Sequence, residues 1–123
     1  MQNSFNPDLG DFIEILNQNQ GDYLLLGGYA VILHGYTRST GVMDLWVKHS
    51  KENYLKLAKA YKDFGTPIFS EKEFLASDFD VWSIGREPSK IEILTHVDGL
   101  NFEESFKNCC WFDLGKIKLP YIF

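Results

Sequence analysis

The apolar positions in the first quarter of the chain are spaced as in an amphipathic helix followed by a buried strand. Four apolar residues recur at helical intervals after Asn6-Pro7, an N-cap residue followed by proline at the first helical position. Gly21 is the predicted end of this helix. The continuous apolar run at 23–26 then predicts a short strand that is buried on both faces. The four helical positions are Leu9, Phe12, Ile13 and Leu16.

The rest of the chain alternates between one clear helix and several strand-like stretches. Ser50 and Gly65 bound an amphipathic helix whose apolar residues recur at helical spacing. Asn101 predicts the start of a brief helix, and Glu104 completes a capping-box pattern there. The other predicted elements are a helix at 29–36, strands at 42–48, 67–69, 79–84 and 90–95, and two short strands around Cys110 and Ile117.

This order of elements predicts an α/β (α+β) fold in which helices pack on a mixed β-sheet. We expect one domain over residues 1–123, because a chain of this length suits a single core. The chain closes on an apolar run at 120–123. A run of this kind suggests either a natural continuation of the chain or a surface that a partner covers.

Composition and charge narrow the classes of protein to which the chain can belong. A hydrophobic content of 45% is enough for a real core and argues against disorder. The net charge of −5 argues against a general nucleic-acid-binding surface, although a bound divalent cation can reverse the charge of a nucleotide site. No apolar run approaches the roughly 20 residues that span a membrane, and residues 1–8 lack the layout of a signal peptide. We therefore expect a cytoplasmic protein with no membrane partner.

Three segments carry residues that suit nucleotide and metal chemistry. Gly27-Gly28 follows a strand and opens a helix, where glycines let a ligand approach the backbone and free amides favour phosphate. Asp44 and Glu92 each lie in an apolar strand, where a charge is costly unless it is paired or coordinates a metal. Together they offer oxygen ligands to a divalent cation. Arg38 and Thr40, just before the second strand, suit phosphate oxygens.

These residues, in this order, resemble the nucleotidyltransferase superfamily with the polymerase-β-like fold. The resemblance rests on Leu26-Gly27-Gly28, thirteen intervening residues, the strand Val42-Met43-Asp44-Leu45 and the later strand Ile91-Glu92-Ile93. It extends over about residues 23–106. The string at 28–41 is similar to a small bacterial subgroup, some relatives of which occur in toxin–antitoxin or phage-defence modules.

The resemblance implies transfer of a nucleoside monophosphate from a nucleoside triphosphate to a hydroxyl acceptor. Gly27-Gly28 and the adjoining helix would bind the triphosphate, with Arg38 and Thr40 as further phosphate contacts. Carboxylates at positions 42, 44 and 92 would hold two Mg2+ ions, one organising the phosphates and the other activating the attacking hydroxyl. Asp44 and Glu92 are thus the expected catalytic and metal-binding residues.

Position 42 departs from the family pattern, because Val42 stands where an aspartate is expected. A valine contributes no ligand and removes a negative charge from a site that must hold several positive ones. The chain is then either a catalytically inactive member that still binds nucleotide, or one whose residue 42 was altered to trap a state. In both cases we expect transfer to be weakened or absent, and we expect restoring aspartate at position 42 to raise metal affinity.

Two other functions fit parts of the sequence. A non-catalytic nucleotide- or partner-binding module of the toxin–antitoxin type would explain Val42 and the apolar C-terminus. A metal-dependent hydrolase would use Asp78 and Asp80, which lie two residues apart. Cys109 and Cys110 are adjacent, a spacing that builds neither a zinc site nor a thioredoxin-like motif, so we expect reduced, partly buried packing residues.

Overall fold

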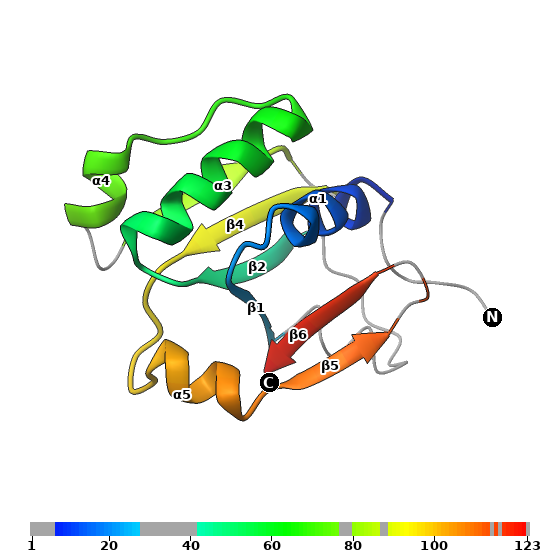
Figure 1. The fold of residues 1–123 in the computed structure, drawn as a ribbon, viewed down its shortest axis with the longest axis vertical. Helices are drawn as coiled ribbons and strands as arrows, with labels where there is room; N and C mark the ends of the chain where they lie inside the picture. Colours follow the sequence, from blue (N-terminus) through cyan, green and yellow to red (C-terminus); the bar gives the residue numbers. More distant parts are fainter. Residues whose placement is uncertain are drawn as a thin grey trace.

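A computed structural model gives the fold of the chain and describes residues 7–27, 42–76, 80–86, 89–113, 115 and 117–122. These residues form a mixed α/β fold, with helices packed on one six-stranded sheet (Figure 1). The helices are α1 (Pro7–Gln18), α3 (Lys51–Phe64), α4 (Glu71–Ala76) and α5 (Phe102–Lys107). The strands are β1 (Tyr23–Leu26), β2 (Val42–Val47), β3 (Val81–Ile84), β4 (Lys90–Leu94), β5 (Cys110–Asp113) and β6 (Lys118–Ile122).

The sheet has the strand order β3-β4-β2-β1-β6-β5 and is mixed, as the sequence predicts. β2 runs parallel to β4 and antiparallel to β1, while β1 runs parallel to β6. The two outer strands, β3 and β5, each pair antiparallel with their inner neighbour. This topology brings β2 and β4 side by side, although α3, α4 and β3 separate them along the chain.

The apolar faces of α1 and α3 explain why both helices lie over the same face of the sheet (Figure 1). All four apolar positions predicted for α1 are fully buried. The predicted ends of α3 are confirmed: the Ser50 hydroxyl accepts a hydrogen bond from the Asn53 amide at 3.1 Å, and Gly65 ends the helix with φ of 90°. Within the described ranges, no helix combines the length and apolar character that a bilayer span requires.

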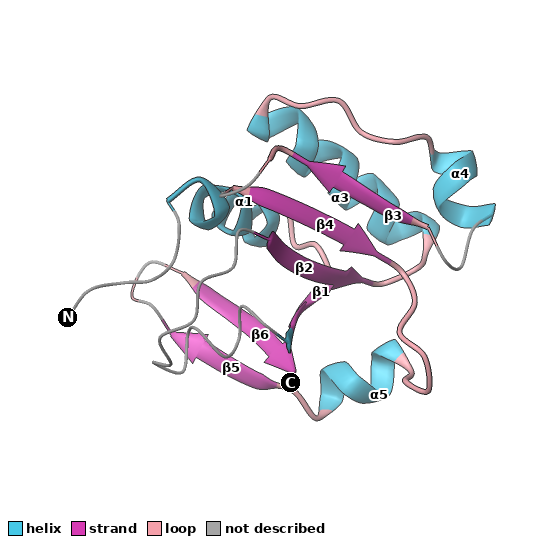
Figure 2. Cartoon of the chain, turned by 180° about the vertical axis from the view of Figure 1, so that it is seen from behind, coloured by secondary structure: helices cyan, strands magenta, loops and turns pink. Residues whose placement is uncertain are grey.

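The two faces of the sheet differ in chemistry. Burial alternates residue by residue over 42–45 of β2 and along β4, so that Met43 and Ile91 face the core beneath α1 and α3. The intervening residues, Asp44 and Glu92 among them, are half-buried on the opposite face, on the side from which Figure 2 is viewed. α5 packs against one end of this second face, because Trp46 of β2 contacts Phe102 of α5 edge-on with ring centroids 5.3 Å apart.

The predicted strand at 67–69 is wrong, and α4, which was not predicted, follows it. Side chains hold this segment in place, since Phe69 stacks on Trp82 of β3 with ring centroids 4.3 Å apart. The Tyr54 hydroxyl also donates to the carbonyl of Phe69 at 2.7 Å. A short apolar run, such as the one that begins at Pro67, does not by itself distinguish a strand from a packed connection. The predicted helix at 29–36 lies outside the described residues.

The apolar C-terminal segment forms β6, between β1 and β5. Leu119, Pro120 and Tyr121 are all buried there, and Tyr121 stacks on Phe112 of β5 with ring centroids 4.1 Å apart. The sheet itself therefore covers these three residues, and they give no argument for a partner surface.

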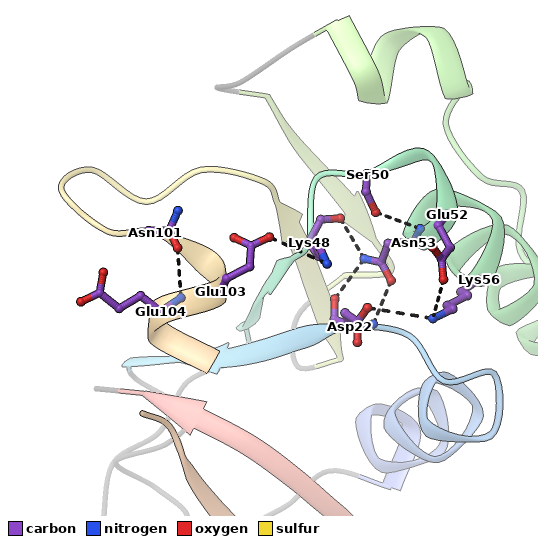
Figure 3. Close-up of polar contacts among 9 residues, drawn as sticks. All are labelled: Asp22, Lys48, Ser50, Glu52, Asn53, Lys56, Asn101, Glu103 and Glu104. Carbon is purple, nitrogen blue, oxygen red and sulfur yellow. Dashed lines mark hydrogen bonds and ion pairs between the residues drawn. The ribbon is translucent and has the colours of Figure 1, made fainter. Parts of the chain in front are cut away.

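A buried asparagine joins β1, β2 and α3 at one end of the sheet (Figure 3). Asn53 is 1% exposed, and its Oδ1 accepts a hydrogen bond from the Asp22 amide at 2.8 Å. Its Nδ2 donates to the carbonyls of Asp22 at 3.0 Å and Lys48 at 2.9 Å. Because Asp22 directly precedes β1 and Lys48 directly follows β2, this one amide fixes two strand ends to the start of α3.

Candidate functional site

Asp44 on β2 and Glu92 on β4 form a carboxylate pair on one face of the sheet. The two strands are parallel, and their register places Asp44 directly opposite Glu92. Residues that are opposite in a parallel pair project from the same face, on strands about 4.8 Å apart. The sequence predicts this geometry, and the structure confirms it. The role of the pair as metal ligands stays a prediction.

Val42 and Lys90 form the next row of the same face. They too are register partners, two residues before Asp44 and Glu92 respectively. The Lys90 Nζ lies 4.0 Å from Oε1 of Glu92, and both side chains are about one-third exposed, at 34% and 30%. A lysine ammonium therefore lies beside the position at which the family pattern requires a carboxylate.

The pKa of the Asp44 carboxyl is raised above its ordinary value by this arrangement. Burial is the largest cause, and repulsion from Glu92 is the second. Attraction to Lys90 acts in the opposite direction and offsets part of the rise. The ionised form of Asp44 therefore destabilises the folded state, and the attraction to Lys90 reduces this destabilisation.

We expect Asp44→Asn to be more stable than the wild type at pH 7, because the folded state no longer holds this unfavourable charge. A group whose pKa is raised on folding stabilises the fold at low pH and loses that contribution as the pH rises through the folded pKa. The difference in melting temperature should therefore shrink as the pH falls to about 4, near the ordinary aspartate pKa. Thermal melts monitored by circular dichroism from acidic to neutral pH measure this.

Asp11→Asn is the matched control for Asp44→Asn, because Asp11 is an exposed carboxylate on α1. Its replacement should change stability by no more than about 0.5 kcal/mol at any pH. If Asp44→Asn were less stable than the wild type at pH 7, the carboxylate would be a structural group and not a strained functional one.

Four strand ends meet at the edge of the sheet where Val42 and Lys90 lie. β2 and β4 begin there, and because β1 and β3 run antiparallel to them, Gly27 after β1 and Gly85 after β3 reach the same edge. Gly27 has φ of 34°, and no described atom lies within 4 Å of the place a Cβ would take.

A pocket of about 510 Å³ is lined by Val42, Gly85, Arg86 and Lys90. Its volume falls in the range of small-molecule sites.

Several predicted site residues lie outside the residues that the structure describes. They are Gly28, Arg38 and Thr40 of the proposed phosphate contacts, and Asp78 of the rival carboxylate pair. Asp80, the other member of that pair, is exposed just before β3. Of the predicted site residues, the described structure therefore assembles Asp44 and Glu92 as a pair and brings Gly27 to the same edge.

The two cysteines are free thiols on and beside β5. Cys109 is half-buried, as expected of a packing residue, whereas the prediction of partial burial is wrong for Cys110, which is exposed. The reason is topological, since β5 is the outermost strand of the sheet and one of its edges has no neighbouring strand.

Among the described residues, the side chains at this edge do not complete a two-magnesium centre. Magnesium prefers six oxygen ligands in near-octahedral geometry, and Asp44 and Glu92 supply only two carboxyl groups. The Lys90 ammonium competes with any cation for Glu92. No three His, Cys, Asp or Glu side chains among the described residues gather in a way that could hold a metal ion.

Sequence reasoning missed Lys90 and Arg86, the two basic residues among the described lining of this pocket. Strand periodicity contained the signal for Lys90, because it precedes Glu92 by two residues as Val42 precedes Asp44. Arg86 could not be found in this way, since it follows β3 in a connection with no periodicity.

Comparison of the chain with models of protein families, with curated proteins and with solved structures finds no match.

Proposed function

We propose that the protein binds a nucleoside triphosphate at this edge of the sheet and has lost efficient nucleotidyl transfer. The observation that carries the proposal is the register of Asp44 against Glu92, with Val42 two residues earlier on the same face. This is the arrangement expected of a nucleotidyltransferase-type site that lacks one of three carboxylates. Gly27 reaches the same edge, and no atom of the described residues lies within 4 Å of its Cβ position; this supports the proposal because a phosphate needs close access to the main chain.

Magnesium is the cation that the resemblance assigns to such a site, and Asp44 and Glu92 would be its remaining ligands. A bound cation would neutralise the two carboxylates and polarise phosphate oxygens. Two carboxylates beside an ammonium group make a weak site for it. We therefore expect magnesium to increase triphosphate affinity by less than about tenfold, a change of less than 1.4 kcal/mol.

Calorimetric titration with each of the four common nucleoside triphosphates, in magnesium and in EDTA, tests the proposal. Weak binding in both conditions is the expected result. Gly27→Val should abolish it, because the side chain would fill the open space beside the backbone. Gly99→Val is the matched control, since Gly99 also has positive φ and open space but lies in the turn after β4. Absence of binding in both conditions would end the proposal, and so would a gain of several orders of magnitude with magnesium.

A non-catalytic partner-binding module, such as one half of a toxin–antitoxin pair, is the second candidate. The observation that favours it is Trp111, which is 58% exposed on the outermost strand β5. Large exposed aromatic side chains are enriched where proteins bind one another. If no triphosphate binds, this candidate becomes the better account of Val42.

A further inference from the structure

The pocket beside Val42 carries two basic side chains, Lys90 and Arg86. Lys90 begins β4, and Arg86 lies two residues beyond the end of β3. None of the described residues that line the pocket is acidic, and Arg86 forms no ion pair within the described part of the chain. In a protein with a net charge of −5, the described lining of this pocket is therefore basic.

Lys90 serves both the pocket and the carboxylate pair. It is the register partner of Val42, so its side chain starts in the row next to Asp44 and Glu92. Its ammonium lies 4.0 Å from Glu92 and also favours the ionised form of Asp44. This is the electrostatic role that a metal ion has beside paired carboxylates.

We propose that the Lys90 ammonium takes the place of the metal ion at this site, and that Lys90 and Arg86 bind a phosphate group of the triphosphate directly. The inference rests on the proposed function, because it assigns the groups that hold the triphosphate. Lysine binds phosphate as a point charge with three donors, and arginine as a planar fork. Val42 fits this arrangement, since an uncharged neighbour leaves Lys90 with donors for the ligand.

Binding of inorganic tripolyphosphate and of the nucleoside triphosphates in EDTA tests the phosphate site. Lys90→Met should weaken binding by about 10- to 100-fold, the effect of losing one charge-assisted hydrogen bond. Arg86→Met should weaken it by about tenfold or more, while Lys90→Arg should retain most of the affinity because the charge remains. Lys48→Met is the matched control, because Lys48 is also a sheet lysine paired with a glutamate, Glu103, at 3.8 Å, but lies at the far end of β2.

Thermal melts without nucleotide test separately whether the Lys90 ammonium takes the place of the metal ion. Magnesium should change the melting temperature of the wild type little, because the Lys90 ammonium already offsets part of the charge of the carboxylate pair and competes with a cation for Glu92. Lys90→Met should melt lower, and magnesium should restore part of the loss. Lys90→Arg should behave as the wild type does, which also shows that the position tolerates substitution.

The outcomes separate this inference from the proposed function. Triphosphate binding that requires magnesium would overturn both. Triphosphate binding that survives in Lys90→Met would overturn the inference while the proposed function stands. An equal magnesium response in the wild type and Lys90→Met would overturn it as well. If the wild type binds no triphosphate in any condition, the proposed function fails and the phosphate site fails with it.

Discussion

Replacing Asn53 with alanine is expected to lower the free energy of unfolding by about 3 kcal/mol. The side chain is 1% exposed and makes three hydrogen bonds to the backbone of Asp22 and Lys48. Alanine would leave the Asp22 amide without this partner, and an unsatisfied buried polar group costs about 1–3 kcal/mol. The carbonyls of Asp22 and Lys48 would each lose one hydrogen bond and keep the one they accept from a backbone amide. For a chain of this size the melting temperature should fall by roughly 10–20 °C. Urea denaturation and thermal melts followed by circular dichroism measure both quantities.

Asn101→Ala is the matched control for Asn53→Ala. Asn101 also begins a helix and accepts a hydrogen bond from the amide of Glu104 at 3.0 Å, but it is exposed to solvent (Figure 3). Its loss should cost about 1 kcal/mol, the usual value of an N-cap. If the two variants lost the same stability, the buried hydrogen bonds of Asn53 would contribute no more than one exposed N-cap, and Asn53 would not be the joint between β1, β2 and α3.

The double replacement Val42→Asp with Lys90→Met is expected to create a magnesium-dependent stability that exceeds the sum of the single changes. Aspartate at position 42 would lie on the face of Asp44 and in register with residue 90. With Lys90 present, this new carboxylate would pair with the ammonium, so Val42→Asp alone should raise metal affinity less than the double replacement does. With methionine there, three carboxylates would repel one another until a cation binds.

The size of this effect follows from mass action. At a magnesium concentration of one hundred times the dissociation constant, binding stabilises the fold by about 2.7 kcal/mol. That corresponds to a rise in melting temperature of roughly 10 °C for a domain of this size. Melts of the wild type, both single variants and the double variant, with and without magnesium, form a double-mutant cycle that isolates the coupling between positions 42 and 90.

Val42→Asn with Lys90→Met is the control, because asparagine has a similar shape to aspartate and no charge. It should show no larger magnesium response than Lys90→Met alone. Transfer of labelled nucleotide by the Val42→Asp, Lys90→Met variant would further indicate that a latent catalytic site was restored. A double variant that melts alike with and without magnesium would instead favour the partner-binding candidate.

The sequence alone was sufficient to predict the elements whose residues carry a local signal. Helical spacing and end signals at Ser50 and Gly65 predicted α3, and the four apolar positions predicted the buried face of α1. Strand periodicity of two put Val42 and Asp44 on one face, which the alternating burial of β2 confirms. These features depend only on neighbours within a few residues, so the order of residue types is enough to determine them.

The tertiary structure decided everything that depends on which segments meet. No local pattern distinguishes Asn53 from a surface asparagine, because its partners lie in Asp22 and Lys48, outside α3. The segment at 67–69 has the composition of a strand, yet its aromatic side chains stack on β3 and its backbone joins no strand. The chemistry of the site depends in the same way on the parallel register of β2 and β4, which sets Lys90 opposite Val42, with its ammonium 4.0 Å from Glu92. Register is fixed by the burial of Met43, Leu45, Ile91 and Ile93 in one core, a property of the folded sheet and not of either strand alone.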